Sequence, residues 1–187
     1  MSNHLSSEEL DFDWLTPYRA KRLKQPKQGR IYQVPRKKEA MKKARIILSR
    51  MRRESTTYSG LDQTRYIQHA LRRICPFIFE ELLLHCFEDM GFAVTRSSYT
   101  HDGGLDGIIW SDEGEKILLQ AKRYWQNIEP DHVLDFIENV IDDSEAAQGL
   151  FVHTGTACDV SQQYMAPFSE HNIGFISDCS LKELVVQ

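Results

Sequence analysis

From residue 76 to the C-terminus, apolar segments of helix length alternate with apolar segments of strand length. A strongly apolar helix is predicted over residues 77–90, and Gly91 stands where a helix-ending glycine belongs. The predicted order is a helix, three strands, a helix, a strand, a helix, a strand and a closing helix. This order predicts an α/β fold with a mixed central sheet and helices on both faces. The predicted strands cover residues 92–96, 105–110, 116–123, 149–153 and 173–177, and the later helices follow Pro130 and cover residues 159–165 and 180–186.

The chain divides into a basic part and an acidic part, although its formal net charge is only −4. Residues 1–75 carry 18 basic and 7 acidic side chains, whereas residues 76–187 carry 5 basic and 20 acidic ones. Such a division is typical of a polyanion-binding segment joined to a second domain, and a solvated basic helix is the alternative. We expect a basic, partly irregular helical extension over residues 1–75 and a separate domain over residues 76–187.

A basic amphipathic helix is predicted within this extension, over residues 36–53. Its apolar side chains form one stripe, and lysines and arginines cover the rest of its surface. The helix can lie along a phosphate backbone, pack on the body of the protein, or lie on an anionic membrane, and we rank these alternatives in that order. The candidate phosphate-binding residues are Lys37, Lys38, Lys42, Lys43, Arg45, Arg52 and Arg53.

The sequence has no pattern typical of a membrane or secreted protein. No apolar run reaches the roughly 18 to 20 residues of a membrane span, and the N-terminus lacks the pattern of a signal peptide. Cys75, Cys86, Cys158 and Cys179 form no CxxC pair and lack zinc-ligand spacing, so we expect buried thiols in a reducing compartment. We therefore expect a soluble, cytoplasmic protein.

Three polar residues stand out in the predicted hairpin. Asp106 opens a short apolar strand after the glycine pair at residues 103–104. In the next strand, the two-residue period places Gln120 and Lys122 on one face. A lysine within a strand is unusual, and its alternative interpretation is an edge-strand lysine that discourages aggregation.

The helix before the hairpin adds a carboxylate. At about 100° per residue, Glu80 lies at the edge of the apolar face, whereas Glu81 and Glu88 point away from that face. Glu80 is therefore the carboxylate that we expect to be half-buried near the sheet. The alternative is a solvated glutamate on the rim of an ordinary amphipathic helix.

These segments together resemble the catalytic domain of Mrr-like restriction endonucleases, within the PD-(D/E)xK nuclease superfamily. The resemblance covers about residues 76–187 and lies in the order and spacing of its motifs. By this resemblance Asp106 is the motif aspartate, Lys122 is the motif lysine and Glu80 is the helical glutamate. Gln120 stands where many relatives have Glu or Asp, and the Gln-x-Lys variant is typical of the Mrr group. The matching segments are residues 79–83, 90–92, 102–106, 119–124, 149–154 and 173–178.

The chemistry implied by the resemblance fits these residue types. Phosphodiester cleavage requires a hard divalent cation held by oxygen ligands. Asp106 is the expected principal ligand, Gln120 offers a neutral amide oxygen, and Glu80 supplies a second negative charge directly or through water. Lys122 is expected to orient or help deprotonate the attacking water, or to stabilise charge on the phosphate. Mg²⁺ is the expected cation, with Mn²⁺ as a substitute.

The resemblance implies a metal-dependent DNA endonuclease with a role in restriction or antiviral defence, associated with the nucleoid when bound to DNA. Scission of both strands calls for a homodimer, since one such site cuts one strand. Two alternatives stay open: a structure-selective resolvase or repair nuclease on the same fold, and a non-catalytic DNA-binding module with a vestigial site. Arg123, Tyr124 and Trp125 follow the motif lysine, and either contact nucleic acid or form an aromatic packing cluster.

Overall fold

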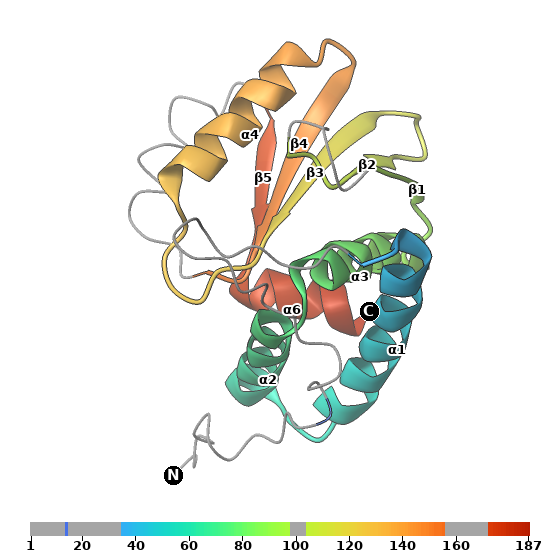
Figure 1. Ribbon diagram of the computed structural model, residues 1–187, viewed down its shortest axis with the longest axis vertical. Helices are drawn as coiled ribbons and strands as arrows, with labels where there is room; N and C mark the ends of the chain where they lie inside the picture. Colours follow the sequence, from blue (N-terminus) through green and yellow to red (C-terminus); the bar gives the residue numbers. More distant parts are fainter. Residues whose placement is uncertain (1–13, 15–34, 98–103, 156–171) are drawn as a thin grey trace.

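A computed structural model describes residues 14, 35–97, 104–155 and 172–187, and these form a mixed α/β fold, as predicted (Figure 1). The predicted helix over residues 159–165 lies outside the described residues, as does most of the predicted irregular lead before residue 36. The helices are α1 (Lys37–Ser55), α2 (Gly60–Arg73), α3 (Pro76–Asp89), α4 (Pro130–Asp142) and α6 (Asp178–Val186). The strands are β1 (Ala93–Arg96), β2 (Gly107–Trp110), β3 (Lys116–Lys122), β4 (Ala146–His153) and β5 (Ile173–Ile176).

The strands form one sheet in the order β1-β2-β3-β4-β5. The first two pairings are antiparallel, and β3-β4 and β4-β5 are parallel. Since β3 lies between β2 and β4, Lys122 is at the end of a central strand. The interpretation of Lys122 as an edge-strand lysine is therefore wrong.

Helices cover both faces of this sheet (Figure 1). Successive side chains of a strand such as β3 point to opposite faces. Leu119 and Ala121 belong to the hydrophobic core that also contains residues of α3, α1 and α6. Leu118 packs with Phe151 of β4 and with the apolar stripe of α4 in a second cluster. The two-residue alternation of side chains in β3 thus explains why neighbouring residues of this strand belong to different hydrophobic clusters.

The basic helix α1 packs against α3 and contributes to the main core. Most of its apolar stripe is fully buried, including Ala44, Ile47 and Leu48, and joins the same cluster as Leu71 of α2 and Phe79 of α3. The expected boundary at residue 75 therefore does not coincide with any break in the hydrophobic core. Of the three arrangements considered for this helix, packing on the body of the protein is the one that its apolar face adopts.

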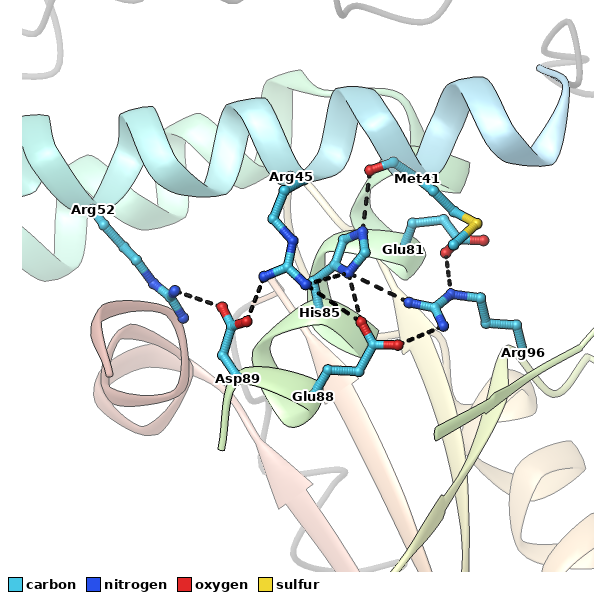
Figure 2. A network of polar contacts seen from close by, with 8 residues as sticks. All are labelled: Met41, Arg45, Arg52, Glu81, His85, Glu88, Asp89 and Arg96. Carbon is cyan, nitrogen blue, oxygen red and sulfur yellow. Dashed lines mark hydrogen bonds and ion pairs between the residues drawn. The ribbon is translucent and has the colours of Figure 1, made fainter. Parts of the chain in front are cut away.

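A network of charges joins α1, α3 and β1 (Figure 2). The Arg96 guanidinium donates to the carboxylates of Glu81 and Glu88, with N–O distances of 2.8 and 2.6 Å. His85 Nε2 donates to the Met41 carbonyl of α1 at 3.1 Å. Glu81 is only 1% exposed, so the prediction that it points away from the core is wrong. A wheel drawn for one helix misses this, because it does not include α1, which packs against α3, or Arg96 of β1, which pairs with Glu81.

The cysteine prediction holds in part. Cys75 and Cys86 are buried free thiols, but Cys179 is exposed because it lies in the first turn of α6, outside the buried stripe of that helix. Cys158 lies outside the described residues. No helix in the part of the chain that the structure describes is both long and apolar enough to cross a membrane.

We predict that Glu81→Gln lowers the free energy of unfolding by about 2 to 3 kcal/mol, because it leaves the largely buried Arg96 without its most buried counterion. Urea unfolding followed by circular dichroism measures this loss. The matched control is Glu39→Gln, which removes the exposed ion pair with Lys43 on α1 and should cost less than about 0.5 kcal/mol. Equal losses in the two variants would contradict the role given to the network.

Candidate functional site

Asp106 is fixed at the point where the pairing of β2 with β3 ends. Its backbone N–H donates to the Leu119 carbonyl at 2.9 Å. Its carboxylate oxygen Oδ2 accepts a hydrogen bond from the Ala121 N–H at 2.6 Å. Asp106 is therefore tied to β3 on both sides of Gln120, through its backbone N–H on one side and through its carboxylate on the other.

Gln120 is 2% exposed and is held by one end of its amide. Its Nε2 donates to the Gly104 carbonyl at 2.6 Å, which fixes the orientation of the amide plane. Its Oε1 is buried and has no hydrogen-bond partner among the described residues. A buried acceptor without a partner costs free energy, so such an atom calls for a ligand. A divalent cation is a ligand that an amide oxygen accepts.

Glu80 reaches this corner because α3 packs closely on β2. A Cβ on Gly107 would lie 2.7 Å from Leu84 Cδ2, so only glycine lets the helix come this near. Glu80 lies one turn before Leu84 on the same side of α3, and Asp106 lies one residue before Gly107. Helix and hairpin thus bring the two carboxylates together.

Burial and neighbouring charges both act on the two carboxyl groups. Burial raises the pKa of Glu80, the Asp106 charge raises it further, and the Lys122 ammonium lowers it, with a result of about 9. Burial also raises the pKa of Asp106, against the lowering effects of the Ala121 N–H and of Lys122. Both carboxyls therefore resist ionisation in the protein alone, and a bound cation would relieve that cost.

The donor set fits a hard divalent cation. Two carboxylates and one amide oxygen, from Glu80, Asp106 and Gln120, are oxygen ligands of the kind that Mg²⁺ and Mn²⁺ accept. Within residues 14, 35–97, 104–155 and 172–187, no group of three or more His, Cys, Asp or Glu side chains is placed to hold a metal. The third oxygen here would come from an amide.

Lys122 ends β3, on the same side of that strand as Gln120, and the chain after it is held by Thr154. The Thr154 N–H donates to the Lys122 carbonyl at 3.3 Å. The Thr154 hydroxyl accepts from the Tyr124 N–H at 3.0 Å and donates to the Tyr124 carbonyl at 2.9 Å. Thr154 is completely buried, so its hydroxyl serves the backbone and caps the strand end.

Arg72 of α2 supports this arrangement from outside the sheet. Its Nε donates to the Thr154 carbonyl at 2.8 Å, and its own carbonyl accepts a hydrogen bond from Arg123. Arg72 therefore positions the segment that directly follows Lys122. The sequence carries no signal for this role beyond a basic residue in the last turn of a helix, because the partner is a backbone carbonyl 82 positions away.

The seven basic residues proposed to bind phosphate are divided between residues with a partner in the fold and residues that the structure leaves exposed. Arg45 and Arg52 of α1 form ion pairs with Asp89 of α3, the second at 2.6 Å (Figure 2). Lys37 donates to the carbonyls of Arg96 and Ser97, and Lys43 pairs with Glu39. These four side chains therefore make contacts within the fold. The other three, Lys38, Lys42 and Arg53, are exposed.

We predict that Glu80→Gln stabilises the metal-free protein more at pH 8 than at pH 5. Because the folded-state pKa of Glu80 is raised, its contribution to stability is present below pH 4.5 and is lost as the pH rises toward about 9. The neutral amide removes that loss. Urea unfolding in EDTA at both pH values measures the difference, and a gain independent of pH would contradict it.

Comparison with known proteins assigns the chain to a family. A family model described as restriction endonuclease, the Mrr catalytic domain, matches residues 71–185, which is more than half of the chain. A search of curated proteins finds no match. The matched region begins in the last turn of α2, five residues before the predicted boundary, and includes Arg72 with Glu80, Asp106, Gln120 and Lys122. The chain therefore belongs to the Mrr-type restriction endonuclease family and carries a nuclease domain of that type.

Proposed function

We propose that this protein is a Mg²⁺-dependent DNA endonuclease that hydrolyses phosphodiester bonds at the site formed by Glu80, Asp106, Gln120 and Lys122. The observation that supports it most is the buried Gln120 Oε1, which has no partner in the described structure. Asp106 contacts the backbone of the two residues on either side of Gln120. A buried, oriented amide oxygen without a partner is a costly arrangement, and a cation held together with the two carboxylates would relieve that cost.

Each of the four residues has a separate task in this proposal. Glu80, Asp106 and Gln120 would hold the cation, which supplies Lewis-acid activation of the phosphate and of the attacking water. Lys122 donates hydrogen bonds to the phosphate oxygens and stabilises the charge that develops there. Arg72 and Thr154 keep the chain after Lys122 in place, so that its ammonium stays directed to the same point. Hydrolysis is a direct displacement by water.

The contacts with DNA must overcome the acidic character of the nuclease domain, since residues 76–187 carry 20 acidic and 5 basic side chains. Lys38, Lys42 and Arg53 are the exposed basic residues of α1 that can contribute phosphate contacts. Restriction or defence against foreign DNA is the proposed role. A homodimer that places one site on each strand is the proposed route to double-strand cleavage.

We predict that the purified protein cuts plasmid DNA with Mg²⁺ or Mn²⁺ and not in EDTA. Asp106→Ala and Lys122→Ala should each lower the rate by at least about 100-fold, because one removes a cation ligand and the other a charge at the phosphate. Glu80→Gln should lower the rate more than Glu81→Gln, whose effect is on stability. Gel electrophoresis of the plasmid forms, with circular dichroism as a check of folding, measures these rates.

Three results would overturn or redirect this proposal. Metal-dependent cutting that survives in the Asp106 or Lys122 variant would remove these residues from the site. Salt-dependent binding of plasmid without any cutting would favour a DNA-binding module with a vestigial site. Preferential cutting of branched over linear duplex DNA would favour a structure-selective resolvase.

A second prediction concerns the cation alone. Gln120→Leu should lower the affinity for Mn²⁺ by about tenfold or more, and Gln120→Glu should raise it, because the ligand is removed in one and gains a charge in the other. Isothermal titration calorimetry without DNA measures both. Gln148→Leu is the matched control, since Gln148 pairs with Ile117 at the opposite end of β3. Unchanged affinity in both Gln120 variants would exclude Gln120 as a ligand.

A further inference from the structure

A pocket of about 710 Å³ is lined by residues that follow Lys122 in the sequence. It is formed by the loop between β3 and α4, which starts at the residue that follows Lys122. The nuclease chemistry proposed above does not use this pocket. Its lining residues are Arg123, Tyr124, Trp125, Gln126, Asn127 and Glu129.

The base of this loop is held firmly against β4. A Cβ on Gly155 would lie 2.8 Å from the Gln126 carbonyl oxygen and 3.0 Å from Tyr124 Cβ, so only glycine permits the approach. The Tyr124 hydroxyl is hydrogen-bonded to His132 Nδ1 at 2.8 Å, and Ile128 is buried. With the Thr154 contacts to Tyr124, these interactions fix the position of the pocket relative to Lys122.

Trp125 presents a large aromatic surface at this pocket. Its side chain is 49% exposed, which is unusual for the residue type that buries the most apolar area. The Arg73 guanidinium of α2 lies 5.8 Å from the centre of the indole ring, a distance typical of a cation–π contact. The indole is thus oriented by a neighbouring helix while much of its surface stays in contact with solvent.

The remaining lining residues select the kind of ligand. A phosphate site would need an excess of cations, but the residues that line the pocket include one cation, Arg123, and one anion, Glu129. Arg123 also donates to the Arg72 carbonyl. Gln126 and Asn127 are both exposed, and each amide offers a donor and an acceptor side by side. An aromatic surface with paired amide groups suits a flat, uncharged heterocycle with hydrogen-bonding edges.

We propose that this pocket binds an unstacked base of the DNA substrate, which stacks on Trp125 and is contacted at its edge by Gln126 and Asn127. The inference rests on the proposed nuclease function for the identity of the substrate. The phosphate bound near Lys122 and the base bound by the loop would then belong to neighbouring positions of one strand, because the loop continues directly from β3. The pocket would give the enzyme a base preference close to the cut.

Binding of two single-stranded oligonucleotides tests this proposal with the full chain in EDTA. One has all four bases, and the other has the same phosphates but abasic positions throughout its central part. Trp125→Ala should weaken binding of the first by about tenfold, the size expected for loss of one base–aromatic stack, and leave binding of the second unchanged. Trp125→Phe should keep most of the affinity. Fluorescence anisotropy of the labelled oligonucleotides measures all of these.

Leu61→Ala is the matched control, since Leu61 of α2 is a similarly exposed apolar residue that does not line the pocket. Quenching of the wild-type tryptophan fluorescence by the base-containing oligonucleotide, lost in Trp125→Phe, provides a second measurement. The proposal is overturned if Trp125→Ala affects both oligonucleotides equally or neither, or if wild-type protein shows no preference for the one with bases. Plasmid cutting by the wild type is scored separately, so failure of the nuclease proposal is distinguished from failure of the pocket.

Discussion

The hydrogen bond from the Ala121 N–H to the Asp106 carboxylate joins the two segments that carry the candidate site. It holds the hairpin charge on β3, a strand whose register is fixed by antiparallel pairing on one side and parallel pairing on the other. Glu80 of α3 lies near this hairpin because Gly107, without a side chain, lets Leu84 of α3 pack closely on the sheet. This hydrogen bond, the register of β3 and the close approach of α3 therefore decide whether the acidic groups and Lys122 meet. A shift of one residue in β3 would turn Gln120 and Lys122 to the opposite face.

Periodicity predicted much of this arrangement and failed where a second element intervenes. The two-residue period correctly placed Gln120 and Lys122 on one side of a strand, and glycine and proline positions gave the order of elements. The helical wheel misplaced Glu81, because a wheel describes the apolar face of one helix and not the helix α1 that lies on its other side. Charge counts likewise could not separate Arg45, which meets Asp89, from Lys42, which meets solvent.

Sequence reasoning also missed contacts that are made through the backbone. Arg72 acts on the carbonyl of Thr154, and any residue offers a carbonyl, so no pattern of side chains marks the partner. The same holds for the loop that follows Lys122, whose aromatic residues could equally have formed a packing cluster. Tyr124 is in fact buried within a cluster, whereas Trp125 is half-exposed. Only the folded chain separates these two neighbours.

The neutral amide of Gln120 affects the net charge of the proposed metal centre. Two carboxylates balance the double positive charge of a divalent ion, whereas a third carboxylate would leave the assembly with a surplus negative charge. With a neutral amide in that place and Lys122 nearby, the loaded centre would carry a net positive charge inside a strongly acidic domain. An approaching phosphodiester would therefore be attracted to this centre, although the domain as a whole is acidic.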